Sequence, residues 1–125
     1  RDNVCSYKAR AEAVRTVMIY KDGLAIAKCP SEGLESPTVV GAQAANDLLN
    51  IAGVKASFVL TPYNNEVYIS ARAIDEVNVQ VLMEKMGGGG HLNIAGAQVK
   101  KPMPEVEEML KNIIDEMYQE EKETK

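Results

Sequence analysis

The run Gly87-Gly88-Gly89-Gly90-His91 is the segment whose residue types point most directly to chemistry. A glycine in regular structure is less favourable than alanine by roughly 0.5–1 kcal/mol, because it loses more backbone entropy on folding. A fold therefore keeps several glycines where the backbone approaches a ligand or directs several N–H groups at one point. A phosphate suits such N–H groups, especially if a helical turn starts at His91. The alternative is a flexible helix-to-strand connection with His91 exposed, since the run is neither GxxxxGK[ST] nor GxGxxG.

Arg72 is the second candidate, because it closes a predicted strand over Glu66–Arg72. The planar guanidinium of arginine matches a phosphate, and the end of a strand holds it rigidly. Ser70 lies one strand period away on the same face and would add a hydroxyl donor. The alternative is a surface arginine paired with Asp75 or Glu76, which would contribute little to stability.

Scarce residue types exclude other chemistry. The single histidine and two isolated cysteines provide neither a His-rich zinc site nor a CxxC pair. We expect Cys5 and Cys29 to be reduced thiols, with one disulfide between them as the alternative. The formal net charge of −4 and the 5% aromatic content argue against a broad surface for binding duplex DNA or long RNA.

The elements that must position these residues follow from hydrophobic patterning. The chain has 125 residues, of which 46% are hydrophobic and 26% charged, as in one globular domain. Two hairpins are predicted from β-branched runs joined by turn residues. Their strands are Val14–Tyr20 with Leu24–Cys29, and Ala56–Thr61 with Glu66–Arg72.

Three main helices are predicted by apolar spacing and capping residues. The first runs from Pro37 to Ala52 after an N-cap at Ser36, the second runs from the Asn78 cap to Met86, and the third spans Pro104–Glu120. We expect Ile94–Ala97 to form one helical turn and Gln98–Lys100 a short strand. The order predicts an α+β fold, a mixed sheet of about five strands flanked by three main helices.

Several of these segments together resemble a known family. They are Ile69-Ser-Ala-Arg72, Asn78-Val-Gln80, Met83-Glu-Lys-Met86 with the glycine run to His91, and Asn93-Ile-Ala-Gly-Ala-Gln98. The pattern is similar to the DHH-associated domain of the DHH phosphoesterases, from about Val14 to the final helix. Within the family it most resembles the membrane-anchored bacterial cyclic di-AMP phosphodiesterases.

The resemblance implies a division of labour between two domains. The DHH domain holds two manganese ions and activates water, and the DHH-associated domain closes over the cleft and holds nucleotide and phosphate. Carried over by residue, the substrate-binding groups are Arg72, Gly88, Gly89, Gly90 and His91, with Ser70 as a weaker member. This chain has no Asp-His-His triplet, so we expect no catalytic residue, no metal site and no hydrolysis by the chain alone.

The composition of the two ends and the resemblance together predict domain limits and partners. Residues 1–13 are expected to be a linker from an upstream domain, residues 14–120 the DHH-associated domain and residues 121–125 a charged tail. The expected partners are the DHH domain of the same polypeptide and a cyclic dinucleotide or short oligonucleotide. The domain is expected to be cytoplasmic without direct membrane contact, and the parent protein to be membrane-anchored.

Three other functions stay open at this point. A RecJ-like phosphodiesterase for short oligonucleotides would use the same residues. A nucleic-acid-binding module like that of alanyl-tRNA synthetases would need no hydrolytic partner. A homodimerisation module would use the apolar stripe of the last helix, from Val106 to Met117.

Overall fold

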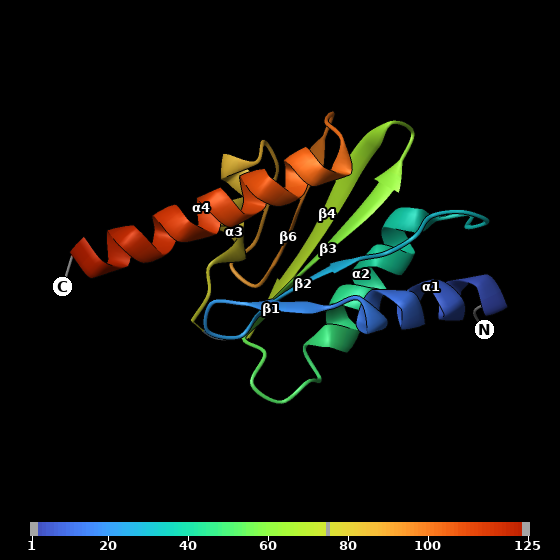
Figure 1. Ribbon diagram of the computed structural model, residues 1–125, viewed down its shortest axis with the longest axis horizontal. Helices are drawn as coiled ribbons and strands as arrows, with labels where there is room; N and C mark the ends of the chain where they lie inside the picture. Colours follow the sequence, from blue (N-terminus) through green and yellow to red (C-terminus); the bar gives the residue numbers. More distant parts are fainter. Residues whose placement is uncertain (1–2, 75, 124–125) are drawn as a thin grey trace.

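A mixed β-sheet forms the centre of the molecule (Figure 1). The computed structural model describes residues 3–74 and 76–123, and this part of the chain contains six strands and four helices. The strand order is β1-β2-β3-β4-β6-β5, and all neighbouring pairs are antiparallel except β2 with β3. The strands are β1 (Met18–Tyr20), β2 (Leu24–Lys28), β3 (Ala56–Tyr63), β4 (Glu66–Ala73), β5 (Gly89–Gly90) and β6 (Ile94–Val99). The predicted α+β class is confirmed, with six strands in place of about five.

Helices cover both faces of this sheet. They are α1 (Val4–Arg15), α2 (Pro37–Leu48), α3 (Val79–Lys85) and α4 (Met103–Glu123). Figure 1 shows α3 and α4 on one side of the strands and α1 and α2 on the other. Because β2 and β3 are parallel, the chain must cross between them, and α2 makes this crossover. The result is one apolar core on each side of the sheet.

Strand β4 shows how the sequence pattern separates these two sides. Its residues alternate between buried and half-buried positions along the whole strand, as expected for a period of two. Val67, Ile69 and Ala71 are buried in the core beneath α3 and α4. Tyr68 and the two predicted site residues that follow it at i+2 and i+4 therefore occupy the opposite face.

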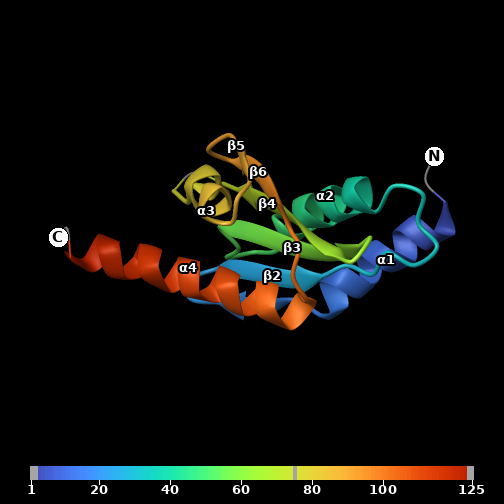
Figure 2. The ribbon, with the colours of Figure 1, turned by 90° about the horizontal axis from the view of Figure 1, so that it is seen from above.

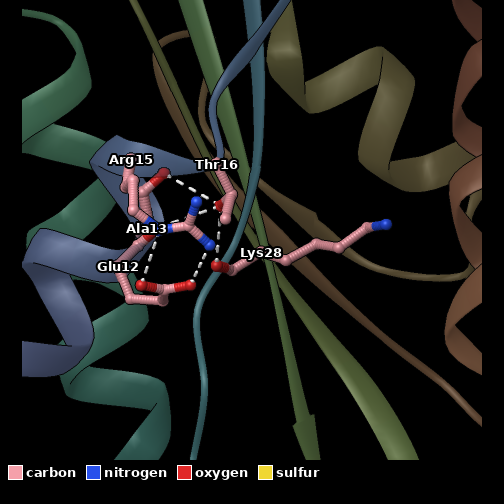
Figure 3. A network of polar contacts seen from close by, with 5 residues as sticks. All are labelled: Glu12, Ala13, Arg15, Thr16 and Lys28. Carbon is pink, nitrogen blue, oxygen red and sulfur yellow. Dashed lines mark hydrogen bonds and ion pairs between the residues drawn. The ribbon is translucent and has the colours of Figure 1, made fainter.

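The first hairpin begins later than predicted. Val14 and Arg15 belong to α1, and β1 starts only at Met18. Arg15 forms an ion pair with Glu12 at 2.6 Å, and the Thr16 hydroxyl donates to the carbonyl oxygen of Glu12 at 3.0 Å (Figure 3). These local bonds extend the helix through residues whose β-branched character favours a strand.

Helix α2 has the predicted start and a shorter length. Ser36 is the N-cap residue with Pro37 in the first turn, although the serine side chain forms no capping hydrogen bond. The helix ends at Leu48 rather than Ala52, because residues after it fold into turns before Gly53 at φ 87°. Helix α3 is capped as predicted, since Asn78 Oδ1 accepts from the backbone N–H of Val81 at 3.2 Å.

The helical turn predicted at Ile94–Ala97 is wrong, because this segment is the first part of strand β6. Ala95 and Ala97 are buried while Ile94 and Gly96 face the other side, which is a strand alternation. Small residues disguise this pattern in the sequence, since alanine and glycine carry little hydrophobic contrast.

The apolar stripe of α4 is part of the intramolecular core. Val106, Leu110 and Ile114 are fully buried, and Met109, Ile113 and Met117 pack against the same cluster. The stripe is thus occupied by the chain's own sheet and is not a free surface for a second copy.

Candidate functional site

The glycine run starts by ending helix α3. The backbone N–H of Gly87 donates to Glu84 O at 3.1 Å, and that of Gly88 donates to Met83 O at 2.8 Å. Gly87 has φ 88°, the left-handed conformation that commonly closes a helix. Two of the amides expected to face an anion are therefore bonded to carbonyl groups of the helix.

The rest of the run forms a tight hairpin. Gly89 pairs with Gly96 and Gly90 with Ala95, and the His91 N–H donates to Ile94 O at 2.7 Å. The helical turn considered at His91 does not form, because the chain there joins β5 to β6, and no helix N-terminus points at a ligand at this position. Since hydrogen-bonded and non-bonded pairs alternate in an antiparallel ladder, the Gly90 amide points away from β6, toward the outer edge of the sheet.

Close packing explains why two positions of the run must be glycine. A Cβ atom on Gly88 would lie 2.0 Å from Gly96 O and 2.7 Å from Ala97 Cα. A Cβ atom on Gly90, whose φ is 146°, would lie 2.5 Å from Ile94 O. Gly89 has open space around the same position. The run therefore combines two packing glycines, Gly88 and Gly90, with two that face open space, Gly87 and Gly89.

The turn after the hairpin is fixed to the neighbouring elements. The N–H of Ala73 donates to Asn93 O at 3.0 Å, and the N–H of Val79 donates to Leu92 O at 3.0 Å. Both bonds join the turn to the end of β4 and the start of α3. His91 is exposed, and these bonds hold its backbone beside the strand end that carries Arg72.

Arg72 lies next to the hairpin through its register with β6. It pairs with Ile94, whose carbonyl oxygen accepts the His91 N–H. Its guanidinium Nη1 donates to the adjacent Ala71 O at 2.9 Å and makes no ion pair within the described residues. Glu76, one of the partners considered above, lies 3.9 Å from Lys55, and Asp75 lies outside the described residues.

Partial burial lowers the pKa of Arg72 from its ordinary value. Because the ordinary pKa of arginine is above 12, the side chain keeps its charge at neutral pH. Arg72 is therefore a half-buried cation at the end of a rigid strand, with most of its N–H donors available.

A groove of about 420 Å³ begins at Ser70, which lies two residues before Arg72 on the same face of β4. Ser70 and Gly88 are the predicted site residues that line it. Figure 2 shows the β5–β6 hairpin beside α3, with α2 further along the same edge of the molecule. The structure thus brings Arg72, Ser70 and the hairpin to one end of the sheet, with Arg72 and the tip of the hairpin outside the groove itself.

Sequence reasoning missed three side chains of this groove, namely Thr38, Tyr68 and Gln98. Tyr68 could have been found, because it precedes Ser70 and Arg72 by two and four residues on the same strand face. Gln98 pairs with Tyr68 across β6, and its side-chain amide donates to Glu66. Thr38 reaches the groove only through the packing of α2, which no local pattern predicts.

Gly41 sets how closely α2 approaches the groove. A Cβ atom at this position would lie 2.6 Å from Thr61 Oγ1 and 3.6 Å from Ser70 Oγ. The Thr61 hydroxyl is buried without a hydrogen-bond partner in the described part of the chain. Helix α2 therefore packs directly over two strand hydroxyls and places its first turn at the wall of the groove.

The acidic and thiol side chains do not converge. Across residues 3–74 and 76–123, no three His, Cys, Asp or Glu side chains are grouped as metal ligands. Cys5 is exposed and Cys29 buried, and both are free thiols. No helix in the described residues is long and apolar enough to cross a membrane.

The fold and the site define an α+β domain with a glycine-rich edge hairpin beside an arginine-bearing strand end. The chain belongs to the DHHA1 domain family, whose model matches residues 22–123. This confirms the resemblance to the DHH-associated domain.

Proteins and structures similar to this chain agree with that assignment. The chain is 43% identical over 117 residues to the cyclic-di-AMP phosphodiesterase PdeA of Listeria monocytogenes, covering 92% of this chain and 18% of that protein. It is 41% identical over 122 residues to the cyclic-di-AMP phosphodiesterase GdpP of Bacillus subtilis, covering 95% and 18%. An exopolyphosphatase-related protein from Bacteroides fragilis has the same fold, with TM-score 0.79 and 21% identity over 93% of this chain and 36% of that one.

Proposed function

We propose that this chain is the substrate-binding domain of a phosphodiesterase that hydrolyses cyclic di-AMP to the linear dinucleotide. The two curated relatives are cyclic-di-AMP phosphodiesterases, and the chain spans 18% of their length. The activity of a whole protein of this kind would therefore depend on domains outside the 125 residues of this chain. Residues 4–13 belong to a helix whose Ala9 and Ala13 pack on the α2 side of the sheet, and we place the connection to the upstream domain there.

The observation that carries the proposal is the position of Arg72. It is the last residue but one of β4, on the face of Ser70 and paired with Ile94 next to the glycine hairpin, and its guanidinium makes no ion pair within the described residues. A half-buried arginine with free donors is a strong partner for a phosphate, because its planar N–H groups can bond two oxygens at once.

The remaining residues would complete a phosphate-binding site around Arg72, which we call the phosphate grip. The exposed His91 lies on the hairpin beside Ile94, the residue that pairs with Arg72, and Gly89 leaves open space for a close approach. The Gly90 amide points to the outer edge of the sheet and would meet a part of the substrate on the far side of the hairpin from Arg72. Gly88 keeps the hairpin tightly packed on β6, and Ser70 offers a hydroxyl that forms no hydrogen bond in the described part of the chain. The role of this set is to bind and orient a phosphodiester.

The hydrolytic chemistry would come from a separate metal-binding DHH domain, for which manganese is the proposed metal. The described residues do not fit a two-metal centre, since they offer no group of three suitable ligands. We accordingly expect no hydrolysis of cyclic di-AMP by the 125-residue chain in the presence of manganese.

Calorimetric titration of the chain with cyclic di-AMP tests the proposal. Saturable binding that Arg72→Ala weakens about tenfold or more is expected, because the variant loses a charge-assisted contact. Arg15→Ala is the matched control, since Arg15 is an exposed arginine of α1 that pairs with Glu12 three residues away and lines no part of the groove. Equal affinity of the wild type and Arg72→Ala would contradict the proposal, as would binding of short RNA with no binding of the dinucleotide.

A further inference from the structure

The groove beside the hairpin contains a half-buried aromatic ring that the phosphate grip does not use. Tyr68 lines it together with Thr38, Ser70 and Gly96. Within the described residues, the side chains of Thr38, Tyr68 and Ser70 form no hydrogen bond with other groups of the chain. Polar groups of a groove that lack partners inside the protein are available to a ligand.

The geometry of β4 places these groups in a line with Arg72. Tyr68, Ser70 and Arg72 alternate with buried residues and so project from one face of the strand. At about 3.4 Å of rise per residue, the row spans roughly 14 Å. Gly96 pairs with Ser70 on β6, so no side chain stands beside the middle of the row on that side, whereas Val59 of β3 lies beside it on the other.

The ring of Tyr68 is held in place from the side. It lies 6.0 Å from the ring of Tyr63, with 50° between the two planes. Gln98 pairs with Tyr68 across β6 and is itself held by Glu66. A ring fixed between two strands offers a stacking surface with little entropy left to lose on binding.

We infer that this groove is the nucleobase subsite of the domain, with the base stacked on Tyr68 while the phosphate of the same nucleotide is held at Arg72. The sugar then passes over Ser70 and the bare surface at Gly96. Thr38, at the first turn of α2, provides the hydroxyl that contacts the edge of the base. The inference rests on the proposed function, because it takes the phosphate position from Arg72.

A pair of probes separates the base from the phosphate. Adenosine 5′-monophosphate carries both groups, and ribose 5-phosphate carries the sugar and phosphate without a base. In two-dimensional NMR titrations of the chain, adenosine monophosphate is expected to shift the Tyr68 ring and Thr38 signals as well as Arg72. Ribose 5-phosphate is expected to shift the signals of Arg72 and the hairpin only.

Substitution gives the matching affinity test. Tyr68→Ala should lower the affinity for adenosine monophosphate about tenfold, within the range typical of base–aromatic stacking. Its affinity for ribose 5-phosphate should stay unchanged. Tyr68→Phe keeps the ring and should bind both probes like the wild type, and Tyr7→Ala on the exposed face of α1 is the aromatic control.

The experiments distinguish a failure of the base subsite from a failure of the proposed function. If Arg72 responds to both probes while Tyr68→Ala binds adenosine monophosphate normally, the base subsite is wrong and the phosphate grip stands. If neither probe shifts Arg72 or the hairpin in the wild type, the proposed function fails and the subsite fails with it.

Discussion

Ser70 lies directly opposite Gly96 in the antiparallel pairing of β4 and β6, so a hydroxyl faces a position without a side chain. Gly96 is in turn paired with Gly89 of the edge hairpin. A Cβ atom on Gly96 would lie 2.8 Å from Ile69 O. The floor of the groove is therefore kept bare by packing constraints within the sheet, while the side chains that could hold a ligand stand around its margin.

The glycines of the hairpin should differ in their effect on stability. Gly88→Ala forces a Cβ atom against backbone atoms of β6, and we expect it to lower the free energy of unfolding by about 1–3 kcal/mol. Gly89→Ala is the control, because its Cβ atom meets nothing within 4 Å. Urea denaturation of the two variants measures the difference. Equal stabilities would show that β5 does not pack on β6 as described.

The two thiols should differ sharply in reactivity. Burial raises the pKa of the Cys29 thiol to about 11, whereas Cys5 is exposed. Because the thiolate is the reactive form, a thiol reagent at pH 8 should label Cys5 quickly and Cys29 only on unfolding. Mass spectrometry of the labelled peptides, with and without denaturant, measures this. Rapid labelling of Cys29 in the folded chain would contradict its placement under α1.

An ion pair between the sheet and α4 predicts a pH dependence. Lys28 Nζ lies 2.7 Å from Glu107, and Figure 3 shows the Lys28 side chain pointing away from the α1 contacts. The hydrogen bond from Lys28, with a second from Lys111, holds the pKa of Glu107 below its ordinary value. A carboxyl with a lowered pKa in the folded state adds stability above its unfolded pKa and loses it as pH falls through the folded value.

Glu107→Gln should therefore be less stable than the wild type at pH 7, by about 1 kcal/mol or less for partly exposed partners. The difference should begin to shrink below the ordinary glutamate pKa of about 4.3 and vanish once Glu107 is protonated. Denaturation curves at pH 7 and at low pH measure both values. A difference that persists unchanged at low pH would rule out the ion pair as its cause.

The buried Thr61 hydroxyl predicts a substitution that stabilises the fold, unlike the Gly88 and Glu107 variants. It has no hydrogen-bond partner in the described residues, and an unpaired buried hydroxyl costs about 1–3 kcal/mol. Thr61→Val replaces it with a methyl group of similar shape and should raise the free energy of unfolding. Ser57→Ala is the contrasting variant, because its hydroxyl donates to Ala45 O at 2.7 Å and its loss should destabilise. A destabilised Thr61→Val variant would indicate a partner for the hydroxyl.

Strong local signals predicted most of the fold. The Asn78 cap and the apolar stripe of α4 specify their helices because capping and amphipathic spacing act within a few residues. The turn at Asn64-Asn65, with both φ values positive, is of the kind that joins two adjacent strands. The prediction for the first part of β6 was wrong because this segment alternates between alanine and glycine, which carry little hydrophobic contrast. The register of the strand is set instead by its pairing with β4.

The sequence predicts part of the candidate site and nothing of its geometry. Arg72 and the glycine run stand out by type and position, and the resemblance assigns them a role. The conformation of the run depends on the packing of Gly88 against β6, a contact between segments that the sequence does not show. Thr38 enters the groove only because Gly41 allows α2 to lie close to Thr61.

The most direct test of the account is a two-dimensional amide NMR titration of the chain with cyclic di-AMP, compared with a short RNA. We predict saturable shifts for the dinucleotide that cluster at Arg72, Ser70 and residues 87–93, and their loss in Arg72→Ala. Shifts with RNA alone, or dinucleotide shifts confined to the opposite face around α4, would contradict a phosphate grip at the glycine hairpin.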